Sequence, residues 1–155
     1  MLFRSLKREI LRRSVIGVIG TGRNRRQNGK GSNATFGADA ALNFFNTISI
    51  NSYYARTQTT GTASAASYRA RFDYTADRYG LSTEHLVVEP KFNPEVGYAQ
   101  RLDISKNYLF GRFSPRPRRI RSIRKLTWQG AYTHLSDAHG EVVQKKEAQG
   151  TFTID

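Results

Sequence analysis

The 155-residue sequence has no cysteine, only four prolines and no long hydrophobic run. Without cysteine there is no disulfide framework, no thiolate metal site and no cysteine nucleophile. A membrane-spanning helix needs about 18 consecutive apolar residues, which this chain does not have. Residues 1–8 are rich in basic side chains, and an apolar run follows at 15–20. This run is too short for the hydrophobic segment of a secretory signal peptide, so we expect no export signal within this chain. An arginine-rich mitochondrial presequence is the alternative interpretation.

Acidic residues are scarce, with 12 Asp and Glu against 25 Lys and Arg and a formal net charge of +13. Such a balance usually indicates a polyanionic partner, either nucleic acid or anionic lipid. The excess is local: residues 1–30 hold nine basic side chains and one acidic, and residues 112–125 hold seven basic and none acidic. The remainder, with 25 − 16 = 9 basic and 12 − 1 = 11 acidic residues, is nearly balanced.

Helical periodicity long enough for a crossover helix is also missing, which argues against a parallel sheet. Alternation with a period of two dominates instead. In residues 67–74, Tyr, Ala, Phe and Tyr fall on one face, and Ser, Arg, Arg and Asp fall on the other. Residues 36–45 and 126–133 alternate in the same way. These three segments are predicted strands with one wet face.

Further segments are rich in β-branched or aromatic residues and are predicted strands with less regular alternation. They are residues 15–21, 47–57, 81–88, 98–104, 108–114 and 142–154. Residues 2–11 suit either a helix or a strand, and we favour a strand. Gly, Asn, Asp and Pro gather between the strands, at 24–33, 59–63, 76–80, 93–97, 115–119 and 137–140, as chain reversals require. We therefore expect an all-β fold: one antiparallel meander of about 8–10 strands over residues 1–155, with 22–33 as a mobile, basic Gly/Asn-rich loop.

The predicted apolar faces consist of Tyr, Phe, Ala and Gly, whereas a soluble sandwich would be dense in Val, Ile and Leu. The chain holds 8 Tyr, 9 Phe and 1 Trp, several of them near predicted strand ends. Aromatic girdles at the two interfaces of a bilayer have this pattern. Because aromatics favour strands in general, the pattern alone leaves a soluble sandwich or barrel open.

Residues 92–98 read FNPEVGY, Arg101 and Asp103 follow, and residues 114–117 read SPRP. This arrangement resembles the C-terminal β-barrel region of bacterial envelope proteins whose N-terminal domain resembles carbohydrate-binding module family 9. There a strand ends in FNPEVGF, followed by an R-x-D segment and an SPRP turn; Tyr98 stands where the family has phenylalanine. Residues 14–23 and 37–39 are similar to two upstream strands of the family, and the similarity runs in order from about residue 8 to residue 154.

The resemblance implies a transmembrane-type β-barrel, or part of one, in a bacterial outer membrane. It also implies that this chain is a fragment, because the carbohydrate-binding-like domain and the export signal would lie upstream in the same gene. The implied role is structural or transport-related, with any link to carbohydrate handling running through that upstream domain. The alternative hypothesis is a soluble, basic β-protein that binds nucleic acid, a partner that we consider unlikely. No enzyme activity and no cofactor are expected.

A polar cluster inside the barrel is one candidate site. Its predicted members are Asn93, Glu95, Arg101 and Asp103, with Glu95 or Asp103 paired to Arg101 in a charge-assisted fork. The alternative interpretation is a proline-fixed turn with solvated charges.

A basic patch is the second candidate site, with the predicted members Arg112, Arg116, Arg118, Arg119, Arg121, Arg124 and Lys125. At the rim of a barrel these side chains would contact lipid phosphates, including those of lipopolysaccharide. In a soluble protein they would contact nucleic-acid phosphates, with binding that weakens steeply as salt rises. The third interpretation is that these side chains lie on solvated loops.

Catalytic and metal motifs are not predicted. Glu84 and His85 would lie on opposite sides of one strand, and no second histidine is near them in sequence. The chain has no G-x-S-x-G elbow, and residues 29–32 lack the spacing and the following helix of a phosphate-binding loop.

Overall fold

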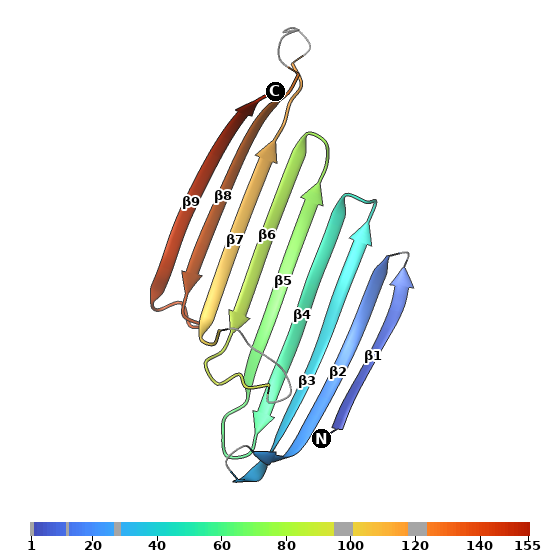
Figure 1. The fold of residues 1–155 in the computed structure, drawn as a ribbon, viewed down its shortest axis with the longest axis vertical. Helices are drawn as coiled ribbons and strands as arrows, with labels where there is room; N and C mark the ends of the chain where they lie inside the picture. The colour runs from blue at the N-terminus through green and yellow to red at the C-terminus, as the bar shows by residue number, and fades with distance from the viewer. Residues whose placement is uncertain (1, 12, 27–28, 95–100, 118–123) are drawn as a thin grey trace.

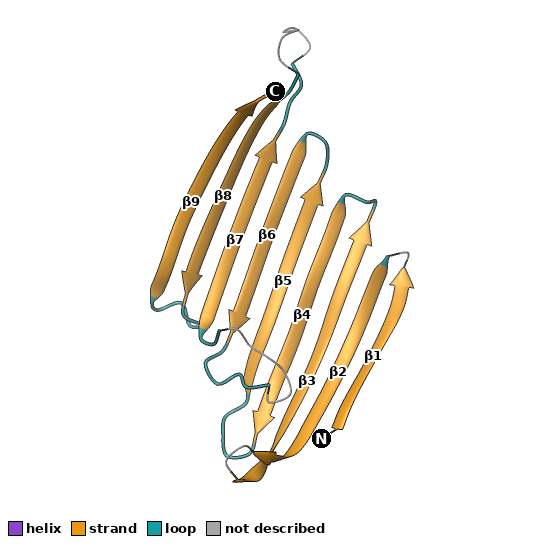
Figure 2. Cartoon of the chain, viewed as in Figure 1, coloured by secondary structure: helices purple, strands orange, loops and turns teal. Residues whose placement is uncertain are grey.

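The computed structural model describes residues 2–11, 13–26, 29–94, 101–117 and 124–155. Nine antiparallel strands form one open sheet in which each strand pairs with the next along the chain (Figure 1). Within the described ranges the chain is strand and loop only (Figure 2). The strands are β1 (Leu2–Leu11), β2 (Ser14–Arg26), β3 (Gly29–Phe44), β4 (Ile48–Thr59), β5 (Ala65–Thr75), β6 (Tyr79–Val88), β7 (Ile104–Phe113), β8 (Leu126–Ser136) and β9 (Val143–Ile154). The predicted all-β antiparallel meander is confirmed, and β1 and β9 are the two edges of the sheet.

The start of β7 differs from the prediction. Residues 98–104 are predicted as a strand, but residues 101–103 lie outside any strand and β7 begins only at Ile104. Asp103 has φ +55°, a left-handed conformation that a strand does not accommodate. Its carboxylate accepts a hydrogen bond from the backbone N–H of Ala138 at 3.1 Å. This turn conformation of Asp103 outweighs the strand preference that the alternating sequence indicates. Residues 98–100 lie outside the described part of the chain.

The predicted loop at 22–33 is wrong over 22–26 and 29–33, which belong to β2 and β3. The two strands stay paired as far as Arg26 opposite Gly29, with one register shift on the way. The buried side chain of Asn33 helps to hold this hairpin against the sheet, because its Nδ2 donates to Thr59 Oγ1 at 2.8 Å. Tertiary pairing therefore overrides the turn preference of the Gly- and Asn-rich sequence.

Directly opposite residues of an antiparallel pair share a face, so the strand registers assign each paired side chain to one of two faces. We call the face that carries Tyr68 and Phe72 the apolar face, and the face that carries Ser67 and Arg69 the polar face. The two faces differ sharply in composition. Among the paired positions outside the register shift between β8 and β9, exposed large hydrophobic residues on the polar face are Phe3 and Ile19, whereas those on the apolar face are Leu2, Leu6, Ile16, Val18, Phe36, Tyr54, Tyr68, Tyr79, Leu81, Leu109, Phe113, Trp128, Tyr132, Phe152 and Ile154.

Carboxylates are found on the other face. All those within the described strands lie on the polar face: Glu9, Asp39, Asp73, Glu84 and Glu147. The small buried core is also on this side. Phe92, which is 7 % exposed, comes from the connection after β6 and packs with Ala65, Val88 and Ile104. On the apolar face Val87 is also buried, at 5 % exposed, but it does not belong to this cluster.

Candidate functional site

A network of ion pairs occupies the middle of the polar face. Glu84 of β6 accepts hydrogen bonds from Arg69 of β5 and, at 3.0 Å, from Lys106 Nζ of β7. Beside it, Arg71 Nε donates to Asp73 Oδ2 at 2.8 Å. Glu84 is 6 % exposed, while its cationic partners are about one-third exposed. Because the cationic partners compensate the negative charge of the Glu84 carboxylate, its burial is tolerated. We call these five residues the ion network.

Alternation along β5 explains why three members of the ion network share a face. Arg69, Arg71 and Asp73 alternate along β5 and therefore share one face. Glu84 joins them because it lies directly opposite Arg71 in the β5–β6 register. The sequence analysis considered Glu84 only as a metal or acid–base candidate beside His85. The structure places His85 on the apolar face, and no group of His, Cys, Asp or Glu within the described residues is arranged to hold a metal ion.

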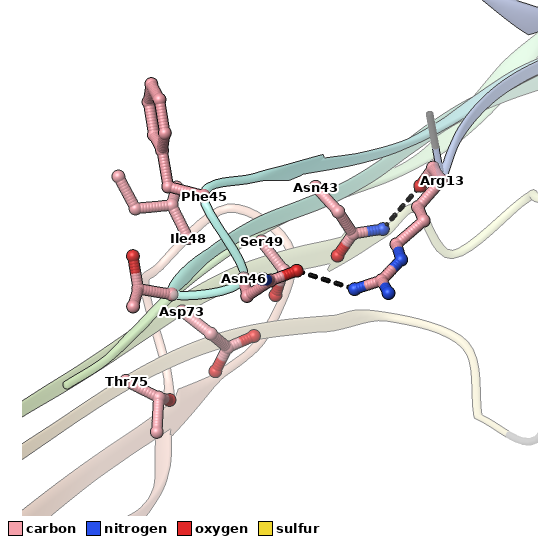
Figure 3. A pocket seen from close by; sticks show the side chains of 9 residues that line it. Arg13, Asn43, Phe45, Asn46, Ile48, Ser49, Asp73 and Thr75 are labelled. Atoms are coloured by element: carbon pink, nitrogen blue, oxygen red, sulfur yellow. Dashed lines mark hydrogen bonds between the residues drawn. The ribbon is translucent and has the colours of Figure 1, made fainter. Parts of the chain in front are cut away.

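A groove runs along the polar face near the β3–β4 turn. Its first part is a pocket of about 590 Å³ lined by Arg13, Asn43, Phe45, Asn46, Thr47, Ile48, Ser49, Asp73 and Thr75 (Figure 3). Arg13 donates to Asn46 Oδ1 at 2.5 Å, and Asn43 Nδ2 donates to the Arg13 carbonyl at 2.7 Å. Asp73 and Thr75 also line a second pocket of about 330 Å³, so the two pockets adjoin.

The second pocket brings aromatic and cationic side chains together. Tyr108 and Phe110 of β7 lie on the polar face there, with Arg71 and Arg112 beside them. The groove therefore offers hydrogen-bond donors, acceptors and ring faces to a polar solute. Local sequence does not predict this groove, because its residues come from strands β3 to β7, from the β3–β4 turn and from Arg13 between β1 and β2, and are brought together only by the fold.

The predicted polar cluster is divided between two places. Asn93 contacts β3 and β4: its N–H donates to Thr57 Oγ1 at 3.3 Å, and its carbonyl accepts from Asn33 Nδ2 at 3.0 Å. Arg101 donates to Gln144 of β9, and Asp103 accepts from Ala138. The predicted Arg101–Asp103 fork is therefore replaced by contacts of each residue with the β8–β9 hairpin. Glu95 lies outside the described residues.

The predicted basic patch is also divided. Arg112 lies on the polar face and donates to the Ala76 carbonyl at 2.6 Å, so its guanidinium does not belong to the apolar side of the sheet. Arg116 forms an exposed ion pair with Asp77 at 2.7 Å. The backbone N–H groups of Arg124 and Lys125 donate to the Asp155 carbonyl. Arg118, Arg119 and Arg121 lie outside the described residues.

Four rings form a ladder across the apolar face, which we call the aromatic ladder. Tyr79, Phe113, Trp128 and Phe152 stand opposite one another on β6, β7, β8 and β9. Successive ring centroids are 5.3, 5.9 and 5.1 Å apart, within the range of favourable aromatic pairs. The sequence analysis noted aromatics near strand ends. That these four fall in one row depends on the register, which the sequence pattern does not specify.

Comparison with models of known protein families, with curated proteins and with solved structures finds no match for this chain. Within the described residues there is no helix long and apolar enough to cross a membrane.

Proposed function

We propose that this chain forms part of the wall of a transmembrane β-barrel in a bacterial outer membrane. In this proposal the apolar face meets lipid and the polar face lines a water-filled lumen. The role of the barrel is structural or serves solute transport, with carbohydrate handling as the task of an upstream domain. The observation that carries the proposal is the one-sided exposure of large hydrophobic side chains across the strands.

That exposure is costly in water. Full burial of a Leu or Phe side chain is worth about 1.5–3 kcal/mol, and soluble monomers rarely leave contiguous apolar patches above a few hundred Å². Here the exposed residues extend from β1 to β9, and Leu109, in the middle of β7, is 51 % exposed. A hydrocarbon layer covers such a face along its whole width, as the lipid-facing side of a barrel requires.

Strand length and aromatic placement agree with this proposal. A tilted transmembrane strand needs about 9–11 residues, and the shortest strands here have 10. The aromatic ladder lies near one end of β6–β9, and Tyr54, in the middle of β4, faces Tyr68 of β5 farther from that end. Along β3, Phe36 and Phe44 are eight residues apart, or about 27 Å at 3.4 Å per residue.

The polar face suits a lumen. Its ion network and groove provide charged and hydrogen-bonding groups, whereas the apolar face has no carboxylate in the described strands. Alternation of lipid-facing and lumen-facing residues along each strand is the general pattern of membrane barrels. The same chemistry supports passage of polar solutes along this face.

The test uses Trp128, the only tryptophan, which lies on the apolar face and is 43 % exposed. The full chain is diluted from urea into buffer, into detergent micelles or into phosphatidylcholine vesicles, and its β-structure and fluorescence are recorded. We expect a cooperative β-signal and a blue-shifted Trp128 emission with micelles and vesicles only. A monodisperse, folded protein in plain buffer with a shielded Trp128 would contradict the proposal, and so would a soluble dimer that packs two apolar faces together.

A further inference from the structure

A row of polar side chains crosses the otherwise apolar face of β6–β9. His85, Asn107, His134 and Lys146 stand directly opposite one another on the four successive strands. His85 Nδ1 lies 2.7 Å from Asn107 Oδ1. His134 Nε2 is buried and has no hydrogen-bond partner in the part of the chain that the structure describes. We call these four residues the basic row.

The basic row runs parallel to the aromatic ladder. Each member is six residues from the ladder residue of its own strand: 79 and 85, 107 and 113, 128 and 134, 146 and 152. Six residues correspond to about 20 Å along a strand, and less across a membrane because barrel strands tilt. The long Lys146 side chain extends this span, since lysines keep their charge at the edge of an apolar layer. Between ladder and row lie apolar or small residues such as Leu81, Leu109 and Tyr132.

The basic row carries positive charge with no carboxylate of the described strands on the same face. The nearest strand carboxylate in sequence, Glu147, points to the polar face and pairs with Lys145 at 2.7 Å. Lys146 therefore presents its ammonium group on a face where the described strands carry no carboxylate. An anionic partner is electrostatically favoured there, and the adjoining exposed hydrophobic band selects one with an apolar portion.

We propose that the basic row binds the phosphate of an anionic lipid headgroup, while the acyl chains cover the band between the row and the aromatic ladder. Lys146 supplies the charge, and the Asn107 amide supplies a hydrogen-bond donor. This inference rests on the proposed membrane location and adds a headgroup preference to it. It also assigns the lipid contact to residues other than the predicted patch, whose member Arg112 is on the polar face.

The test compares two neighbouring lysines. The full chain is folded into vesicles of phosphatidylcholine alone or with one-fifth phosphatidylglycerol, and binding is measured by Trp128 emission. Lys146→Gln should lower the preference for the anionic vesicles about fivefold, the effect of one cation near a lipid surface. Lys145→Gln removes the same charge from the polar face and should leave the preference unchanged. Lys146→Arg should retain the preference.

Equal losses for the two glutamine variants would overturn the inference, because they would show an effect of net charge alone. Asn107→Leu provides a second measurement should Lys146→Gln not fold: it removes a donor without changing charge and should also reduce the preference. An unchanged preference in that variant would count against the basic row. Failure of the unaltered chain to insert into either vesicle would instead reject the proposed membrane location, so the two failures are distinguishable.

Discussion

Glu84 of β6 and Lys106 of β7 form an ion pair on the polar face, with Nζ 3.0 Å from Oε1. Arg69 binds the other carboxylate oxygen, and Arg71 lies 3.7 Å from the same oxygen, so three cations from the strands on either side contact the buried Glu84. This arrangement ties β5, β6 and β7 together through side chains as well as through the backbone ladder.

Removing the carboxylate should therefore destabilise the sheet. We expect Glu84→Gln to lower the free energy of unfolding by about 1–3 kcal/mol, because Arg69 and Lys106 lose their shared negative charge and one of the two acceptor oxygens becomes an NH2 donor. Urea unfolding in detergent micelles measures this change. The control is Glu147→Gln on the edge strand β9, whose exposed pair with Lys145 should contribute little. Equal stability of both variants and the unaltered chain would show that the network is not structural.

A charge on the apolar face should oppose insertion. Leu109→Arg places a guanidinium in the middle of β7 on the proposed lipid side, and we expect about 2–4 kcal/mol of destabilisation in phosphatidylcholine vesicles. Gln149→Arg on the polar face of β9 is the matched control and should fold normally. The measurement is the urea midpoint of folding into vesicles. If Gln149→Arg were the more damaging substitution, the assignment of the two faces would be reversed.

The depth of two positions should differ in lipid. Trp128 belongs to the aromatic ladder, so we expect bromine atoms near the headgroups to quench its fluorescence more than bromines deep in the acyl chains. Leu109→Trp, combined with Trp128→Phe, should show the opposite order of quenching. Vesicles with bromines at known depths provide the measurement. The same order at both positions would contradict a ladder at the interface.

The connection after β6 should depend on Asn33. Its buried side chain bridges Thr59 Oγ1 and the Asn93 carbonyl, which belong to β4 and to that connection. Asn33→Ala should cost about 1–3 kcal/mol, since it removes both hydrogen bonds that the buried Asn33 amide donates. Amide hydrogen exchange should accelerate around Phe92 and Asn93. Exchange that speeds up equally throughout β8 and β9 would indicate general unfolding instead.

Alternation along single strands could be predicted because it depends on local sequence. The faces of Tyr68, Arg69 and Arg71 follow directly from the period of two, and the expected antiparallel meander is confirmed. Local composition failed where tertiary pairing decided the outcome. The Gly- and Asn-rich segment beside Asn33 is a paired hairpin, and Asp103 adopts a left-handed turn where a strand was predicted.

Contacts between strands could not be predicted, because a shift of one residue in register exchanges the two faces of a strand. Glu84 meets Arg69 and Lys106 only in the observed register of β5, β6 and β7. The same holds for the basic row, whose members are spread from residue 85 to residue 146. Periodicity shows which side chains of one strand share a face, and the register shows which residues of different strands share a face and are neighbours.

The sheet ends at β1 and β9, whose outer backbone groups have no partner strand within the described residues. Water solvates such N–H and C=O groups, but in hydrocarbon each unsatisfied group costs several kcal/mol. In a bilayer both borders must therefore be hydrogen-bonded, to each other or to additional strands. In the proposed membrane location, pairing of the two edge strands and insertion into the bilayer are therefore coupled. A sheet whose edges are still unpaired stays at the water interface.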